Sequence, residues 1–273
     1  MLFAIVAPIL LSIYYSMTTW AGFGKLTFVG MKNFREVLFT DTTFWRSVLN
    51  AVILMFVTIF IQNPIAFALA GVLRRVGKGS RMFRTIYFVP AILTVVVITK
   101  LWVSIYNPNY GLLNKVLHDI GFKSISIAWL SNTSTALGAV IFIMIWWGFG
   151  WALLFYYSGL MTMPKEIEEA AIIDGANSLQ MYTRVVIPYL MPVIQAVIII
   201  AVISSLKQME VIYLSTNGQP GDVSQFVANY LYLKAFTYSQ YGYGSAVSVV
   251  FVVVAIVFTL ITRRLTNQSP EAD

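Results

Sequence analysis

The sequence contains no cysteine and a single histidine, His118. Disulfide frameworks, thiolate metal sites and thiol nucleophiles are therefore excluded, and one histidine does not make a metal site. Charged residues form only 11% of the chain, whereas a soluble domain carries roughly 25%. No phosphate-binding loop of the form G-x4-G-K-[ST] is present. We therefore expect neither an enzyme active site nor a metal or cofactor bound by this chain.

Apolar residues are abundant instead: 59% of the chain is hydrophobic and the mean hydropathy is +0.78. A spanning helix needs about 20 mostly apolar residues. We predict an all-α integral membrane protein with a single transmembrane domain over residues 1–273. The first apolar run lacks a basic start and a small-residue cleavage site, so it is interpreted as a retained helix rather than a signal peptide. The predicted spans, about six by that criterion, are Leu2–Thr19, Val48–Leu69, Ile86–Val103, Leu137–Tyr157, Leu190–Leu206 and Ser245–Thr262.

The net charge of +7 reflects basic residues that lie between the apolar runs, which favours membrane orientation over nucleic-acid binding. The densest group follows the second span, and Arg263 and Arg264 follow the last span on the same side. We expect these ends, and both termini, to be cytoplasmic. Residues 20–45, 104–136 and 207–244 then face outward, and the last of these, rich in aromatic rings, is expected to lie against or re-enter the bilayer. The dense basic group comprises Arg74, Arg75, Lys78, Arg81 and Arg84.

The inside loop Ser158–Tyr189 holds four of the eleven acids. Thr162 can cap a short helix and Pro164 suits its first position. Gly175 can end that helix in the left-handed conformation. Asn177 or Ser178 can cap a second short helix. The pair is suited to docking into another protein, although an amphipathic loop on the lipid surface is an almost equal alternative on composition alone.

The same loop resembles the EAA loop of ABC importer permeases, EAA-x3-G-x9-I-x-L-P. The matching residues are Glu169-Ala170-Ala171, Gly175, Val185 and Ile187-Pro188. Val185 and Ile187 depart from the pattern conservatively. The resemblance implies a type I ABC importer permease fold in which this cytoplasmic loop couples to an ATPase. The residues to which it gives that role are Glu169, Ala170, Ala171, Asp174, Gly175 and Pro188.

Other segments are similar to the maltose/lactose-type sugar permeases of the MalF pattern. They include Phe28–Phe34, Tyr110–Asn114, Thr216–Pro220 and Gly242–Ala246, so the resemblance covers nearly the whole chain; Gln219 stands where the family usually has a second glycine. The resemblance implies a multi-pass permease in a bacterial cytoplasmic membrane that carries a sugar. Its implied partners are a second, MalG-like permease, a cytoplasmic ATPase dimer that binds ATP and Mg, and an extracytoplasmic sugar-binding protein. Membrane lipid surrounds it, and no nucleic acid is expected.

Polar and aromatic groups inside the spans are candidates for the substrate pathway, because polar groups are costly in hydrocarbon. By the same resemblance, Trp147, Gly148 and Trp151 match sugar-contacting positions. We expect Gly148 to leave room for a sugar ring and Lys207 to pair with Glu210. Lipid-facing tryptophans are the alternative, and Gln62-Asn63-Pro64 is interpreted as a kink. The complete predicted pathway is Trp147, Gly148, Trp151, Lys207, Gln208 and Glu210.

The alternative function is a secondary transporter driven by an ion gradient. Such a protein needs a buried acid or broken helices at a midplane ion site. No acid lies within the predicted spans, which favours the ATP-driven importer.

Overall fold

The computed structural model describes residues 2–76, 80–122 and 126–266, and these are predominantly helical. Lys78, one of the predicted cytoplasmic charges, lies outside the described residues. Strand pairing in the described ranges is limited to one isolated bridge, Thr18 with Phe28. The helices, with π-helical turns labelled η, are α1 (Leu2–Ser16), α2 (Lys32–Phe39), α3 (Thr42–Val57), η1 (Thr58–Gln62), α4 (Asn63–Val76), α5 (Ser80–Ile92), α6 (Val95–Ile105), α7 (Leu112–Asp119), α8 (Ala136–Thr162), α9 (Lys165–Ile173), α10 (Ser178–Gln180), η3 (Met181–Val186), α11 (Ile187–Tyr189), α12 (Met191–Leu206), α13 (Glu210–Ser215), α14 (Val227–Tyr232), η4 (Leu233–Thr237) and α15 (Tyr241–Thr266).

The second predicted span is longer at both ends than the sequence suggested. It runs through α3, η1 and α4 as one stretch of 35 residues, Thr42–Val76. Asp41 caps its start, accepting a hydrogen bond from the Phe44 N–H. Pro64 cannot donate a backbone hydrogen bond, and directly before it the Asn63 N–H reaches back to the Thr58 carbonyl as a π turn. The predicted interruption is therefore a local rearrangement within a continuous helix.

The third predicted span, in contrast, is not one helix. Thr85–Ile92 and Val95–Ile105 meet at an angle of 106°. Thr94 lies between them in an extended conformation, and a new helix starts after it. Proline at position 90 weakens the end of α5, but the composition stays apolar across the break, so hydropathy alone indicated a single span.

By length and composition, three described helices can cross a membrane: Thr42–Val76, Ala136–Thr162 and Tyr241–Arg264. Two bent pairs raise this to five if each pair is one span, the second pair being Ser178–Tyr189 with Met191–Leu206 at 70°. A shorter apolar helix covers Val6–Ser16. Apolar helices thus occupy every predicted segment, and the all-α membrane fold is as expected.

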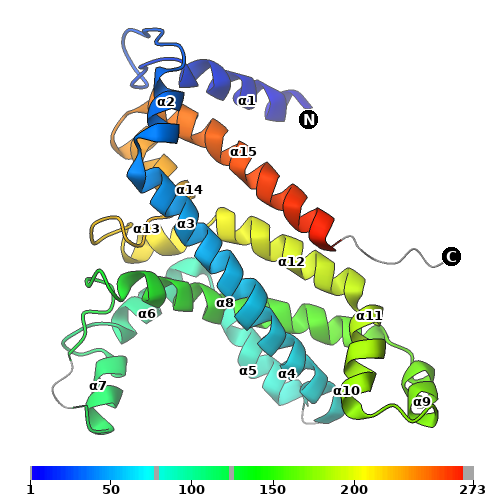
Figure 1. Cartoon of the computed structure of the whole chain (residues 1–273). Helices are drawn as coiled ribbons and strands as arrows, with labels where there is room; N and C mark the ends of the chain where they lie inside the picture. The colour runs from blue at the N-terminus through cyan, green and yellow to red at the C-terminus, as the bar shows by residue number, and fades with distance from the viewer. Residues whose placement is uncertain (1, 77–79, 123–125, 267–273) are drawn as a thin grey trace.

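The two ends of the molecule differ in character (Figure 1). The start of α1, the end of α15 and the short helices α9 and α10 lie toward one end. The loop after α1, helix α7 and helices α13 and α14 lie toward the other. The spans therefore run between two distinct faces, as alternating inside and outside loops require.

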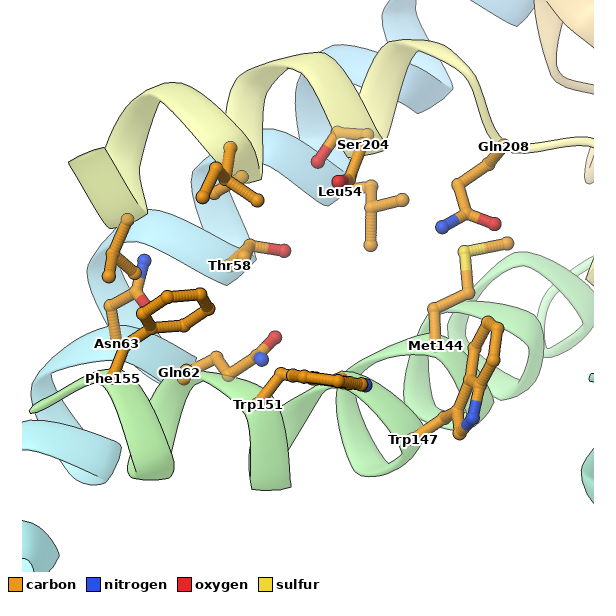
Figure 2. A pocket seen from close by; sticks show the side chains of 16 residues that line it. Leu54, Thr58, Gln62, Asn63, Met144, Trp147, Trp151, Phe155, Ser204 and Gln208 are labelled. Carbon is orange, nitrogen blue, oxygen red and sulfur yellow. The ribbon is translucent and has the colours of Figure 1, made fainter. Parts of the chain in front are cut away.

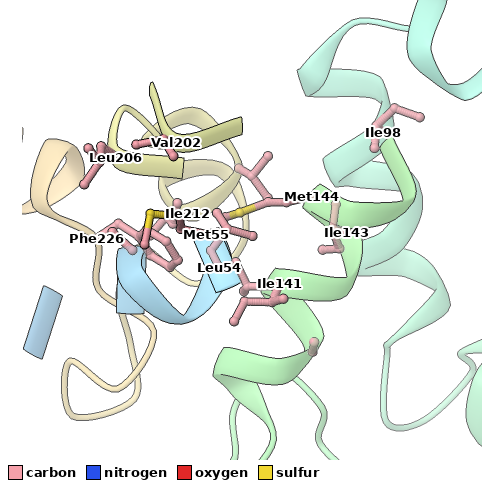
Figure 3. Close-up of a cluster of buried hydrophobic side chains, with 14 of the residues drawn as sticks. Leu54, Met55, Ile98, Ile141, Ile143, Met144, Val202, Leu206, Ile212 and Phe226 are labelled. Carbon is pink, nitrogen blue, oxygen red and sulfur yellow. The ribbon is translucent and has the colours of Figure 1, made fainter. Parts of the chain in front are cut away.

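Buried apolar side chains from α3, α6, α8, α12 and α13 form a shared core (Figure 3). Leu54, Ile98 and Met144 belong to this cluster, and Ile212 and Phe226 join it from the segment after α12. A second cluster joins α4 to α8 and to residues before and within α12. These contacts hold α3–α4, α8 and α12 in fixed positions around the space described next.

The segment after α12, predicted from the sequence to face outward, folds back onto the first half of α3. Asn50 donates to the carbonyls of Val223 and Gln225 at 2.9 and 2.8 Å. The Asp41 carboxylate also accepts hydrogen bonds from the hydroxyls of Tyr230 and Tyr243. This segment is thus tied to two spans by polar side chains; its re-entry into the bilayer stays a prediction.

Candidate functional site: a cavity between the spans and a coupling surface

A cavity of about 360 Å³ lies between α3–η1–α4, α8 and α12 (Figure 2). One wall is aromatic and comes from α8: Trp147, Trp151 and Phe155. Trp151 is 51% exposed, so the cavity is not closed on that side within the chain. Its size and mixed lining are those of a small-molecule site.

The two indoles are held in place by the neighbouring broken span. Trp147 Nε1 donates to the Leu93 carbonyl at 3.2 Å, at the break between α5 and α6. Trp151 packs edge-on against Phe88, with ring centroids 5.6 Å apart. The bend of 106° thus has a consequence at the site, because it exposes a carbonyl that orients one tryptophan.

The opposite walls carry short polar side chains. Figure 2 shows the Thr58 hydroxyl and the Gln62 amide pointing inward from one side, and Ser204 and Gln208 from α12 and its end on the other. No charged side chain is among the described residues that line the cavity. The polar lining residues are Thr58, Gln62, Asn63, Ser204, Ser205 and Gln208.

The structure brings four of the six predicted pathway residues together at this cavity: Trp147, Gly148, Trp151 and Gln208. Lys207 and Glu210 do not line it. Helix α12 ends at Leu206, and a short turn carries both side chains to exposed positions. The expected Lys207–Glu210 ion pair is not among those that the described residues form, so that pairing was wrong.

The two glycines among the α8 aromatics have different neighbours from those expected. A Cβ at Gly148 would lie 3.3 Å from Gln62 Nε2, so the space beside this glycine holds the amide rather than an open gap for a sugar ring. A Cβ at Gly150 would lie 2.5 Å from the Tyr87 carbonyl oxygen. Gly150 therefore permits close approach of α5, and Gly148 permits Gln62 to reach the cavity.

Gln62 and Asn63, predicted from the sequence to form only a kink, also line the cavity. Both are buried, at 6% and 4% exposure. The sequence did contain an indication of this role, because two adjacent amide side chains within an apolar span are energetically costly and are usually retained for a function.

The coupling loop has the two-helix form predicted from its sequence. Helix α9 ends at Ile173, and Gly175 follows with φ +79°, the left-handed conformation expected of it. Asn177 caps the second helix through a reciprocal capping box with Gln180. The start of α9 differs: Thr162 belongs to α8, where its hydroxyl donates to the Gly159 carbonyl, and Pro164 precedes the helix instead of opening it.

Contacts to α4 and α8 fix the position of this loop. Arg74 of α4 forms an ion pair with Glu168 of α9. The Tyr189 hydroxyl donates to the Thr162 carbonyl at 3.0 Å. A second cavity, of about 420 Å³ and also lined by Glu169, lies between α4 and the loop.

The outward side of the loop is exposed and partly apolar. Helix α9 has no buried residue, and Ile172, Ile173 and Leu179 are 64%, 84% and 74% exposed. The predicted coupling residues Glu169, Ala170, Asp174, Gly175 and Pro188 are exposed and Ala171 is partly exposed. We call residues 165–180 the coupling surface; an exposed apolar patch of this kind is typical of a surface that contacts another protein or the membrane.

Spans that enclose an uncharged cavity, together with a projecting loop, define a membrane transport component. Residues 62–268 match the family described as "Binding-protein-dependent transport system inner membrane component", and the chain belongs to that family. This family, whose members include ABC transporter permeases, supplies membrane components of transport systems and not enzymes, as expected from the sequence.

Curated relatives and solved structures agree with this assignment. The probable ABC transporter permease protein YurN of Bacillus subtilis is 32% identical over 267 residues, 97% of this chain and 91% of the relative. The multiple sugar-binding transport system permease protein MsmF of Streptococcus mutans is 32% identical over 255 residues, 93% and 87% of the two chains. A chain of a bacterial alginate ABC transporter, solved with an alginate pentasaccharide-bound periplasmic protein, superposes with a TM-score of 0.84 at 23% identity, covering 97% of this chain and 90% of that one.

Proposed function

We propose that this chain is the permease subunit of an ATP-driven importer that carries a sugar across the cytoplasmic membrane of a bacterium. The main support for this proposal is the uncharged cavity in which Trp147 and Trp151 face hydroxyl and amide side chains. A sugar has apolar C–H faces and a rim of hydroxyls, so its site needs aromatic platforms together with hydrogen-bonding groups. The name of the relative MsmF, a multiple sugar-binding transport system permease, supports this substrate class.

The chain acts with three kinds of partner. A second, MalG-like permease covers the side of the cavity at which Trp151 is half exposed. A pair of cytoplasmic ATPase subunits, which bind ATP and Mg, contacts the coupling surface around Glu169 and Gly175. An extracytoplasmic binding protein delivers the sugar to the outer segments. In this arrangement both termini and the coupling surface are cytoplasmic, and residues 1–273 act as one transmembrane domain.

Transport proceeds by alternating access. Closure of the ATPase pair on ATP moves the two coupling loops, and the Arg74–Glu168 ion pair and the Tyr189–Thr162 hydrogen bond transmit that motion to α4 and α8. Since α4 and α8 carry two walls of the cavity, their displacement changes the side to which the cavity opens. The site must bind the sugar weakly enough to release it. Uncharged hydrogen-bonding side chains on the cavity wall meet this requirement.

Reconstitution tests this function. The purified chain alone should show no ATP hydrolysis above background, because it has no phosphate-binding loop. Proteoliposomes that hold the complete complex should take up sugar only with internal ATP and external binding protein. Hydrolysis by the chain alone, or uptake driven by an ion gradient without ATP, would contradict the proposal.

The sugar contacts are tested by Trp151→Ala and Gln208→Ala. Each should lower sugar flux sharply in an assembled complex whose ATPase still responds to the binding protein. Unchanged flux and selectivity in both variants would place the sugar contacts elsewhere in the permease pair.

A further inference from the structure

The π turn in the middle of the second span places two neighbouring amide side chains at the cavity. Gln62 is 6% exposed as a residue, and its amide group faces the cavity. Asn63 is 4% exposed, and its Nδ2 has no hydrogen-bond partner among the described residues. A buried amide nitrogen without a partner costs about 1–3 kcal/mol, so Asn63 Nδ2 indicates that a ligand at the cavity satisfies it, and the neighbouring Gln62 amide is available to the same ligand.

The backbone explains why both amides lie at this depth. At the π turn, the Asn63 N–H bonds to the Thr58 carbonyl, one residue further back than in an α-helix. Thr58 and Gln62 then both line the cavity, and Figure 2 shows their polar ends directed toward its centre. Gly148, on the facing helix, leaves the space that Gln62 Nε2 occupies. The π turn and Gly148 together direct the Gln62 amide into the cavity, where a bound ligand would lie.

The lining also restricts the charge of the occupant. The described lining residues include amides, hydroxyls, indoles and apolar groups but no cation or anion. A carboxylate or ammonium group buried here without a counter-charge would lose several kcal/mol of hydration, whereas hydroxyls exchange water for amide partners at little cost.

We propose that Gln62 and Asn63 form a saccharide-binding subsite facing Trp151, and that the sugar carried by this chain is neutral. This inference rests on the proposed function and narrows its substrate class. A side-chain amide both donates and accepts, so Gln62 can bond two neighbouring hydroxyls of one sugar ring while Trp151 stacks on its C–H face. Asn63 Nδ2 donates to a further hydroxyl oxygen.

The test uses the whole complex, isolated through a tag on this chain and reconstituted into proteoliposomes with internal ATP and external binding protein. Uptake is measured for neutral gluco-, galacto- and xylo-oligosaccharides and for uronic-acid oligosaccharides of the same lengths. Binding-protein-stimulated ATP hydrolysis is measured in the same vesicles and reports assembly. We expect uptake of neutral sugars and at least tenfold less uptake of uronic-acid oligosaccharides.

The subsite is tested with Gln62→Met, which keeps the volume of the side chain and removes its hydrogen bonds. We expect neutral-sugar uptake to fall at least tenfold while stimulated ATP hydrolysis stays within twofold. Gln62→Asn keeps an amide and should lie between this variant and the wild type. The matched control is Ile61→Met, since Ile61 lies in the same π turn but is 52% exposed and does not line the cavity.

The outcomes separate the two proposals. Unchanged uptake in Gln62→Met, or an equal loss in Ile61→Met, overturns the subsite. Preferred uptake of uronic-acid oligosaccharides overturns the neutral-sugar assignment and leaves a sugar importer. Failure of the wild-type complex to take up any sugar contradicts the proposed function itself.

Discussion

At the scale of single residues, the pair Gly148 and Gln62 gives a sharp prediction. A Cβ at position 148 would lie 3.3 Å from Gln62 Nε2, so Gly148→Ala should displace the amide by a few tenths of an ångström. We expect sugar uptake to fall about three- to tenfold, roughly 1 kcal/mol, in the range of one weakened hydrogen bond. In a Gln62→Ala background the same change should have no further effect, because the clash is gone. A double-mutant cycle on uptake measures this coupling; additive losses would contradict it.

A second residue-scale prediction concerns Gly175 in the coupling loop. A Cβ there would meet nothing within 4 Å, so the left-handed backbone, φ +79°, is the only local obstacle to substitution. Gly175→Val should cost on the order of 1–2 kcal/mol and weaken co-purification of the ATPase, while Gly175→Ala should cost less. Glu169→Lys should weaken the same association by reversing a charge on the coupling surface.

The control for both changes is sugar binding by the isolated binding protein, which should stay normal. A Gly175→Val complex that assembles and transports like wild type would remove Gly175 from the coupling role.

Individual residues also show what the sequence could not supply. Trp147, Trp151 and Gln208 were predicted because they match a known pattern at fixed offsets, and they meet at one cavity. Gln62 was interpreted as part of a kink, since a proline follows within two positions and explains a bend by itself. Only the three-dimensional arrangement shows that the rearranged turn carries a buried amide toward the aromatic wall.

At the scale of secondary-structure elements, apolar composition located an apolar helix in every predicted segment but not its length or geometry, since three helices are long enough to cross a membrane alone and two further segments are bent pairs. The break between α5 and α6 was missed because residues 93 and 94 lie within an unbroken apolar run, and a hydropathy window does not register backbone angles. The start of α9 was placed too early because Thr162 and Pro164 are typical of helix beginnings, although α8 extends through Thr162. In contrast, Gly175 and Asn177 were predicted well, since their roles depend on local chemistry alone.

The junction of α3, α14 and α15 yields an element-scale prediction. The Asp41 carboxylate accepts from the hydroxyls of Tyr230 and Tyr243, and the Lys234 ammonium lies 5.3 Å from the centre of each ring. Burial raises the pKa of Tyr230, and its hydrogen bond to Asp41 raises it further, so this hydroxyl stays protonated and donates. Tyr230→Phe should destabilise the chain by about 1.5–3 kcal/mol, as expected for a hydrogen bond to a charged group.

Thermal unfolding of the detergent-solubilised complex measures this loss. Tyr238→Phe is the matched control, because Tyr238 is 59% exposed and belongs to the same outer segment. Since Tyr230 and Tyr243 donate to the same oxygen of Asp41, each single variant leaves one donor in place, and the double Phe variant should lose more than the sum of the two single variants. Equal melting of wild type and Tyr230→Phe would contradict a stabilising junction.

At the scale of the whole molecule, the polar groups are divided between the two faces and the cavity. One face holds the hydrogen bonds of Asn50 and Asp41 to the segment after α12, whereas the opposite face carries the Arg74–Glu168 pair and the exposed coupling surface. Between them the cavity walls hold hydroxyls and amides without charge. Under the proposed function a solute in the cavity meets neutral hydrogen-bonding groups, and the coupling loop is linked to α4 and α8, which carry two of the cavity walls.

The orientation of the whole chain in the membrane gives the last prediction, and the absence of cysteine makes it clean to test. Ser178, on the coupling surface, and Ser131, between α7 and α8, are both exposed. A membrane-impermeant maleimide added to intact cells should label Ser131→Cys at once and Ser178→Cys only after permeabilisation. The reason is the arginine density beside the coupling loop, since basic residues near helix ends stay on the cytoplasmic side. The cysteine-free parent is the control, and the reverse labelling order would invert the topology and remove the coupling surface from the ATPase.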